Sequence, residues 1–366
     1  MHLFPALSKR YSHERMSAGE AQRMAQFIAW APMVFQVSRL MVKFGILDML
    51  RDNQDGLTQD ELVQRTKLSP YAIKILTEAS LSAGIVLVEE ETGRFSLSKT
   101  GWFLLTDDST RVNMDFNHDV NYRGMFFLEE ALKNEKPEGL KTLGDWPTIY
   151  EGLSKLPEEV QKSWFGFDHF YSDNSFDEAL NIVFANNPRH LMDVGGNTGR
   201  FALRCVAHSA DVNVTIVDLP GQIGMMRKNI SGKTGAERIA DYAANMLDNA
   251  SELPKGEWDA IWMSQFLDCF SEAQIVAILQ KAAAVMTPKT RLFIMETFWD
   301  RQQYETTALC LTMTSVYFTA LANGNSKMYH SEDMARLIAQ AGLKVVTTHD
   351  GIGRGLTRSS SRHNIQ

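Results

Sequence analysis

The chain has 366 residues, more than one hydrophobic core usually serves, so we expect two domains or one domain with a large appendage. With 44% hydrophobic and 22% charged residues it has an ordinary globular composition, and its net charge of -7 argues against binding nucleic acid through phosphate neutralisation. Three scattered cysteines argue against a disulfide framework, and no stretch suits a signal peptide or a membrane span, so we expect a cytoplasmic protein with no metal and no membrane partner.

The first predicted element is an apolar helix over residues 33–50. Its apolar residues recur at helical spacing with almost no polar face, which is typical of a helix buried on most sides. Packing against a second copy of the chain would supply that burial. Because Met41 and Ile46 lie in this segment, we expect an aspartate at either position to disturb a dimer.

A winged helix is predicted next. Thr58 with Glu61 forms a capping box, and Ser69 before Pro70 marks the start of a second short helix. Residues 85–98 then indicate two strands joined by a turn at residues 91–93. Residues 33–105 carry eight basic and nine acidic side chains, with an acidic turn between the strands, so this module is not expected to bind DNA.

Residues 107–177 are rich in aromatic side chains and partly helical. Most of these side chains are expected to pack in a core, and some to wall a pocket for a planar ligand. From residue 189 onward, short apolar runs alternate with helical patterns, which predicts a doubly wound, mostly parallel sheet. The runs are 191–194, 212–217, 239–243, 260–263, 292–295 and 343–348, and the helices between them include 202–207 and 273–286.

A glycine-rich turn, residues 193–199, follows the first strand of this sheet. Its glycines permit close approach of a ligand to the backbone, and the following helix offers partially positive amides. Asn197 and Arg200 stand where a dinucleotide fingerprint needs glycine, which disfavours a pyrophosphate. Asp218 ends the second strand and is placed to accept hydrogen bonds from ribose hydroxyls. The pattern therefore indicates a ligand with a ribose and no pyrophosphate.

These motifs, in this order, resemble the S-adenosylmethionine-dependent O-methyltransferases of the plant caffeic acid and acetylserotonin type. The resemblance implies a winged-helix dimerisation domain (1–110), and a Rossmann-like α/β methyltransferase domain (111–366) with a helical lid (111–178) and a core (179–366). It implies a homodimer, a small-molecule acceptor, and S-adenosylmethionine as cofactor, with S-adenosylhomocysteine as product. The residues matching the cofactor site are Asp193, Gly195, Gly196, Gly199, Asp218, Leu219, Asn245, Met246, Ser264 and Gln265.

The chain departs from the family pattern where the catalytic base is expected. Asp268 stands at the position of the family's histidine, and Glu296 matches the first of two carboxylates that orient it, while Met328 replaces the second. If Asp268 and Glu296 share a pocket, one of them is expected to be partly protonated near neutral pH. His330 and His169 are the candidates for a replacement base. His169, Phe170 and Met328 are assigned to the substrate pocket.

The leading interpretation is O-methylation of a small aromatic hydroxyl acceptor. Two alternatives remain open at this point. One is a methyltransferase-like protein that uses the cofactor's positive charge to support hydroxylation or decarboxylation. The other is a winged-helix regulator that senses a ligand without catalysis.

Overall fold

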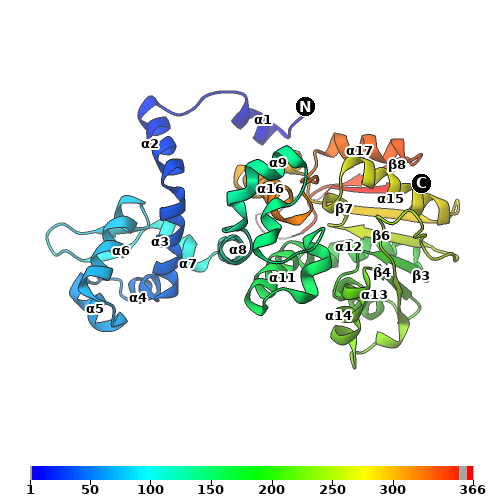
Figure 1. The fold of residues 1–366 in the computed structure, drawn as a ribbon, viewed down its shortest axis with the longest axis horizontal. Helices are drawn as coiled ribbons and strands as arrows, with labels where there is room; N and C mark the ends of the chain where they lie inside the picture. The colour runs from blue at the N-terminus through cyan, green and yellow to red at the C-terminus, as the bar shows by residue number, and fades with distance from the viewer. Residues whose placement is uncertain (1, 354–360, 366) are drawn as a thin grey trace. The chain divides into compact units, whose positions relative to one another are not determined.

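The computed structural model describes residues 2–353 and 361–365 (Figure 1). The chain divides into two compact units. The smaller comprises His13–Asp115, and the larger combines Met1–Ser12 with Phe116–Gln366. The sequence-based boundary after residue 110 lies inside α8 (Asp108–Phe116), and the first residues of the chain belong to the larger unit.

The smaller unit contains short helices and a two-stranded antiparallel hairpin. Its elements are α2 (Ala18–Ala29), α3 (Ala31–Lys43), α4 (Ile46–Asp52), α5 (Gln59–Thr66), α6 (Pro70–Ser82), β1 (Val86–Val88), β2 (Phe95–Leu97) and α7 (Lys99–Thr106). The predicted caps are confirmed, since Thr58 and Glu61 form a capping box at α5 and the Ser69 hydroxyl accepts from the amide of Ala72 at α6. The predicted hairpin is confirmed as well.

The predicted single helix over residues 33–50 is wrong, because the segment forms two helices. Gly45 separates α3 from α4 and adopts a φ of 70°, a left-handed conformation that interrupts a helix. Met41 and Ile46 are fully buried in the unit's own core, so they do not lie on a surface available to a second chain. The apolar character of this segment therefore reflects packing within one chain.

The larger unit is built on a seven-stranded sheet with the order β5-β4-β3-β6-β7-β9-β8. The strands are β3 (His190–Val194), β4 (Asn213–Asp218), β5 (Ile239–Ala243), β6 (Ala260–Ser264), β7 (Arg291–Glu296), β8 (Val345–His349) and β9 (Ser361–Ile365). The pairs from β5 through β7 are parallel, which confirms the doubly wound prediction, and the six predicted apolar runs correspond to β3 to β8. Only the antiparallel β9 was not predicted.

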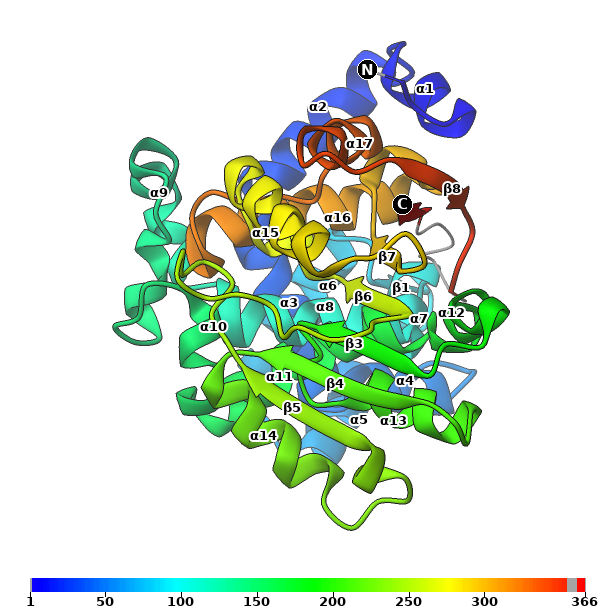
Figure 2. The same ribbon diagram turned by 90° about the vertical axis from the view of Figure 1, so that its right-hand side faces the viewer.

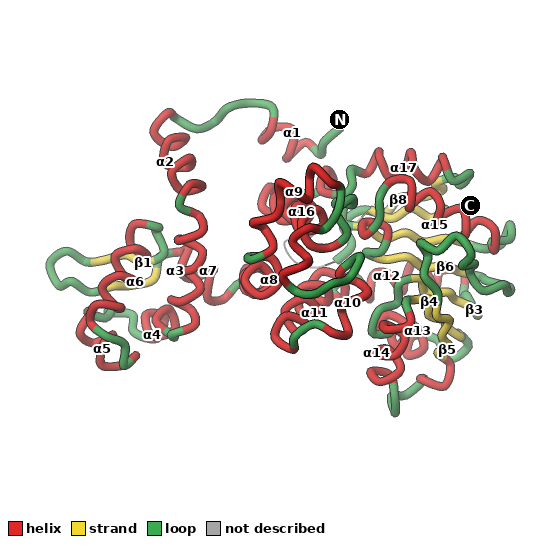
Figure 3. Tube along the Cα trace, in the orientation of Figure 1, coloured by secondary structure: helices red, strands yellow, loops and turns green. Residues whose placement is uncertain are grey.

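Helices cover both faces of this sheet (Figures 2 and 3). Alternate residues of each central strand point to opposite faces, so Met192 packs with α15 (Glu272–Val285) and α17 (Ser331–Gln340), while Leu191 packs on the other face. That other face is covered by α12 (Phe176–Val183), α13 (Arg200–His208) and α14 (Pro220–Ile230).

A third hydrophobic cluster lies beside the carboxyl ends of the strands and is rich in aromatic side chains. Its helices are the end of α8, α11 (Glu158–Asp173) and α16 (Glu305–Tyr317), with the short α10 (Ile149–Gly152). The remaining helices of the unit are α1 (Pro5–Tyr11) and α9 (Leu128–Asn134). No helix in the described part of the chain has the length and apolar character needed to cross a bilayer.

Candidate active site

The glycine-rich turn after β3 has the close-approach geometry that its sequence predicts. Gly195 and Gly199 adopt φ values of 78° and 79°. A Cβ added at Gly195 would lie 2.4 Å from the Phe266 ring, and one at Gly196 would lie 2.9 Å from a carboxylate oxygen of Asp193. Side chains at these positions would clash with the site, whereas Gly199 starts α13 and packs on α14.

Asp218, at the end of β4, faces the same turn. Its carboxylate accepts hydrogen bonds from the backbone amides of Asn197, at 2.8 Å, and Leu219, at 2.7 Å. Burial raises the pKa of Asp218 to about 6, although both hydrogen bonds favour the ionised form. The carboxylate is therefore held rigidly beside the turn.

A large cavity opens at the carboxyl ends of β3, β4 and β6, with about 1340 Å³ of empty space including its open mouth. One part of its wall is polar and comes from the sheet edge. The other part is aromatic and comes from the end of α8, from α10 and α11, and from the end of α16 with the residue after it. The sheet-edge part includes Gly195, Asn197, Asp218, Leu219, Asn245, Met246, Gln265 and Asp268, and the aromatic part includes Phe116, Tyr150, Trp164, Phe167, Tyr317 and Phe318.

A second, smaller cavity adjoins the first beneath the glycine-rich turn. Asp168, Gly195, Asn197 and Gln265 line both cavities. Three buried polar atoms of residues that line the second cavity have no hydrogen-bond partner within the described structure: Oδ2 of Asp193, Oγ1 of Thr198 and Oγ of Ser264. Because buried polar groups are normally paired, this cavity fits a polar ligand group.

Asp268 and Glu296 form a buried carboxyl pair at the first cavity. Asp268 lines the cavity, whereas Glu296, at the end of β7, lies behind it and accepts from the amides of Phe266 and Leu267 at 3.1 and 2.8 Å. Burial raises the pKa of Asp268 to about 6. Burial and the neighbouring Asp268 raise the pKa of Glu296 well above its usual value. Both carboxyl groups therefore take up a proton more readily than exposed carboxyl groups do.

Two models of known protein families match parts of this chain. A model described as an O-methyltransferase domain matches residues 171–344, and one described as a Dimerisation2-like domain matches residues 22–95. Residues 171–344 therefore form an S-adenosylmethionine-dependent O-methyltransferase domain.

Curated relatives carry O-methyltransferase names, and a solved structure shows the same fold. Demethylspheroidene O-methyltransferase of Rhodobacter capsulatus is 25% identical over 320 residues, which cover 85% of this chain and 74% of the relative. O-methyltransferase FrzF of a Cladobotryum species is 24% identical over 264 residues, which cover 66% of this chain and 60% of the relative. The structure of human N-acetylserotonin methyltransferase superposes with a TM-score of 0.65 at 15% identity, covering 95% of this chain and 99% of that one.

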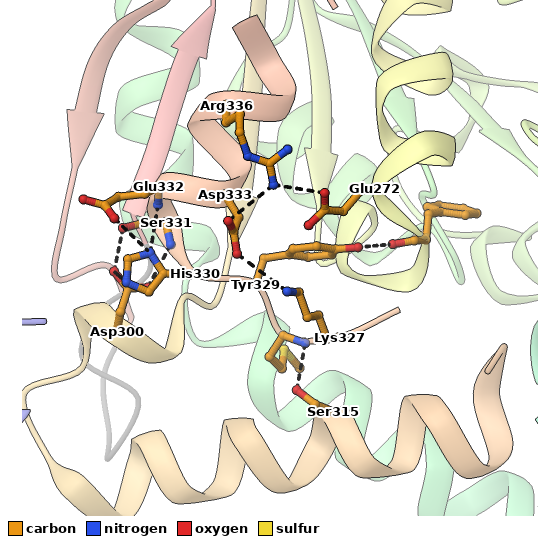
Figure 4. Close-up of polar contacts among 12 residues, drawn as sticks. Glu272, Asp300, Ser315, Lys327, Tyr329, His330, Ser331, Glu332, Asp333 and Arg336 are labelled. Atoms are coloured by element: carbon orange, nitrogen blue, oxygen red, sulfur yellow. Dashed lines mark hydrogen bonds and ion pairs between the residues drawn. The ribbon is translucent and has the colours of Figure 1, made fainter. Parts of the chain in front are cut away.

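His330 has a structural role in this O-methyltransferase, and its assignment as a replacement base is wrong. It precedes α17, where Nδ1 accepts the amide hydrogen of Glu332 at 3.2 Å (Figure 4). Nε2 therefore carries the proton and donates to the carbonyl of His2 at 3.0 Å. Asp300 lies 3.7 Å away and bonds Ser331. The imidazole is absent from the lining of the large cavity.

The three residues assigned to the substrate pocket lie in different places. Met328 lines the large cavity. His169 lines the second cavity, and burial lowers its pKa to about 4, so it is neutral near pH 7. Phe170 lines neither cavity and packs against Tyr171 instead.

Sequence reasoning missed Asp168, the neighbour of His169 that lines both cavities. It lies one helical turn from Trp164 on α11, so the same face carries an aromatic wall and a carboxylate. A helical-face analysis of residues 158–173 would have placed the two together.

Proposed function

We propose that this protein transfers a methyl group to the hydroxyl of a small aromatic acceptor, with Asp268 as the catalytic base. The observation that carries the proposal is a buried carboxylate, Asp268, at the wall where an aromatic cavity meets the glycine-rich turn. The relatives bear methyltransferase names, most of them O-methyltransferase names, and one is a C-20 methyltransferase. Neither the hydroxylase or decarboxylase alternative nor the regulator alternative finds support in them.

The donor site has the groups that S-adenosylmethionine needs. We assign the ribose hydroxyls to Asp218, the adenine to Leu219, Asn245 and Met246, and the methionine end to the second cavity, where Asp193 and Ser264 have unpartnered polar atoms. Bound there, the cofactor supplies a methyl group already activated on a sulfonium, so positioning contributes much of the acceleration. Gly195 and Gly196 keep the backbone open for it.

Asp268 accepts the hydroxyl proton as the acceptor oxygen becomes methylated. Its pKa of about 6 keeps it ionised near neutral pH while making it a stronger base than an exposed aspartate. We assign the proton of the pair to Glu296, which leaves Asp268 as the ionised member. The pair thus replaces the histidine of the family pattern.

The cavity's wall defines the acceptor. Aromatic rings and Met328 offer an apolar surface for a planar molecule, and none of the residues that line the cavity in the described structure is a lysine, arginine or histidine. A carboxylate on the acceptor would meet Asp168 and Asp268 without a compensating cation. We therefore expect neutral or positively charged aromatic alcohols to be accepted, and hydroxybenzoates of similar size to be rejected.

Calorimetric titration tests the donor site. The wild-type protein is expected to bind S-adenosylmethionine with micromolar affinity, and Asp218→Asn to bind it roughly tenfold to a hundredfold more weakly, because a hydrogen bond to a charged group is worth about 1.5–3 kcal/mol. The control is Asp241→Asn on the neighbouring strand β5, which removes a carboxylate that pairs with Arg227 on α14. Equal affinity in Asp218→Asn would remove the ribose assignment. Formation of S-adenosylhomocysteine that depends on an added acceptor separates methyl transfer from the alternatives.

We also propose a homodimer through the smaller unit. No residue of α2 is buried, and the exposed apolar side chains of α2 and the start of α3 form one set: Met24, Phe27, Ile28, Trp30 and Met33. Exposed apolar groups in such number mark an interaction surface. The match of residues 22–95 to a dimerisation model supports a second copy of the chain as the partner.

Light scattering tests this surface. Ile28→Asp is expected to convert the dimer into a folded monomer or a soluble aggregate, because an unpaired carboxylate at an apolar interface costs several kcal/mol. Leu87→Asp, at a similarly exposed position on β1, is expected to remain dimeric. Met41→Asp is expected to unfold the smaller unit, since Met41 belongs to its core. A dimeric Ile28→Asp protein would place the interface elsewhere.

A further inference from the structure

Asp168 lies at the junction of the two cavities. It is on α11. Three other residues line both cavities: Gly195 and Asn197 of the glycine-rich turn, and Gln265 after β6. Of its side chain, 24% is accessible. The first cavity holds the proposed nucleoside contacts and the second the proposed contacts to the methionine end, so a group that joins nucleoside to amino acid passes beside Asp168.

Asp168 is a partly buried carboxylate with few hydrogen-bond partners in the protein. The amide nitrogen Nδ2 of Asn197 donates to its Oδ2 at 2.9 Å, and His169 Nδ1 lies 3.6 Å from the same oxygen. His169 is neutral near pH 7 and adds no positive charge. A carboxylate accepts up to about four hydrogen bonds. The carboxylate therefore has a deficit of hydrogen-bond donors from the protein.

Other charged groups around Asp168 make this deficit larger. Asp173 on α11 and Asp268 after β6 both disfavour the ionised form, and Arg200 at the start of α13 favours it but is itself paired with Asp173. Burial, followed by these two carboxylates, raises the pKa of Asp168 to about 7. Asp218 lines the first cavity nearby and adds further negative charge. The junction is thus suited to a positive charge.

The methyl donor and its product differ in charge at one atom. S-adenosylmethionine has a positively charged sulfonium between its nucleoside and amino-acid parts, and S-adenosylhomocysteine has a neutral thioether there. We propose that Asp168 is the residue with which this protein distinguishes the charged donor from the demethylated product, by binding beside the sulfonium. This inference rests on the proposed donor site. It means that product release is favoured as soon as the methyl group has left.

Asn197 acts as the positioning residue for this carboxylate. Its side-chain oxygen accepts from Gln222 Nε2 at 3.0 Å, which fixes the orientation of the amide so that Nδ2 points to Asp168. Its φ of 50° is a left-handed conformation that asparagine tolerates and glycine adopts freely. Asn197 thus gives the turn a function that a glycine there would lack.

Titration calorimetry with three ligands tests the inference: S-adenosylmethionine, S-adenosylhomocysteine, and sinefungin, which has a charged amine near the position of the sulfonium. In the wild-type protein both cationic ligands are expected to bind more tightly than S-adenosylhomocysteine. In Asp168→Asn this preference is expected to fall roughly tenfold, with the affinity for S-adenosylhomocysteine little changed. Asp177→Asn removes an exposed carboxylate that pairs with Arg204 outside both cavities, and should retain the preference.

The outcomes separate the inference from the function on which it rests. If folded wild-type protein binds none of the three ligands, the proposed donor site is wrong. If all three bind but Asp168→Asn keeps the wild-type preference, or loses affinity for all three equally, Asp168 does not sense the charge and the inference is overturned.

The same preference is expected to depend on pH. Protonation of Asp168 removes its attraction for the sulfonium, so the preference should rise as the pH increases through about 7 and be weak at pH 5. Asn197→Gly removes the hydrogen bond that favours the ionised form, which raises the pKa of Asp168, so this rise should move to higher pH. An Asn197→Gly protein with the wild-type pH dependence would show that Asn197 does not act through Asp168.

Discussion

Asp268→Asn is expected to lower kcat by roughly 10²–10⁴-fold, the usual contribution of a positioned base to proton transfer. The substitution keeps the size of the side chain and removes its ability to take a proton. The donor affinity measured by calorimetry should change little in comparison, because Asp268 lies at the acceptor wall rather than beside the proposed adenine and ribose contacts. A drop in kcat with donor binding retained is therefore the expected signature.

The pH profile gives an independent readout of the same base. The rate requires ionised Asp268, so it should rise with pH through about 6 and reach a plateau above. In Asp268→Asn this rise should disappear along with most of the activity. A full-activity variant, or one that keeps the wild-type profile, would show that another group accepts the proton.

Glu296→Gln is the matched comparison within the carboxyl pair. The amide oxygen of glutamine can accept from the backbone amides of Phe266 and Leu267, and the neutral amide imitates the protonated form assigned to Glu296. We expect a loss of about tenfold or less in kcat, far smaller than for Asp268→Asn. An equal loss in both variants would mean that Glu296 itself exchanges the proton during turnover.

The sheet and the glycine-rich turn were predictable because both follow from local patterns. Parallel strands buried on two faces appear in the sequence as apolar runs. Gly195 adopts a positive φ, a conformation that favours glycine, so the glycine itself indicates the turn. Asp218 is placed by the same logic, at the carboxyl end of the strand next to β3. These residues share one sheet edge, so chain order fixes their arrangement.

The failures concern residues whose partners come from distant segments. His330 bonds the carbonyl of His2, a contact across 328 positions that no local pattern indicates. Met41 was assigned to an interface because an apolar helix has the same sequence pattern whether its partner is the same chain or a second one. Asp168 was missed because its importance depends on Asn197, 29 positions away.

The second large effect is expected at Asp193, the buried carboxylate at the end of β3. Only 2% of the residue is exposed, its Oδ2 has no hydrogen-bond partner in the described structure, and Asp218 lies near enough to repel it. Burial, with the charge of Asp218, raises the pKa of Asp193 to about 8. The group is therefore mostly protonated at pH 7 in the absence of a ligand.

This shift makes the stability of the ligand-free protein depend on pH. In the unfolded chain the pKa of an aspartate is about 3.9, so between about pH 4 and pH 8 the folded state binds more protons than the unfolded state. The contribution of Asp193 to stability is complete below pH 4 and is lost as the pH rises through 8. Asp168, Asp218 and Asp268 act in the same direction with pKa values of about 6 to 7.

Asp193→Asn is therefore expected to stabilise the ligand-free protein at pH 8 by roughly 1–3 kcal/mol, with a smaller gain at pH 5. Denaturant unfolding of the wild-type and variant proteins at pH 5 and at pH 8 measures the gain in free energy of unfolding at each pH. The same variant should bind S-adenosylmethionine more weakly, because the second cavity loses the carboxylate assigned to the methionine end. Opposite changes in stability and affinity would show that this charge is kept for binding at a cost to the fold. If Asp193→Asn and the wild-type protein show the same difference in free energy of unfolding between pH 5 and pH 8, Asp193 does not titrate in this range.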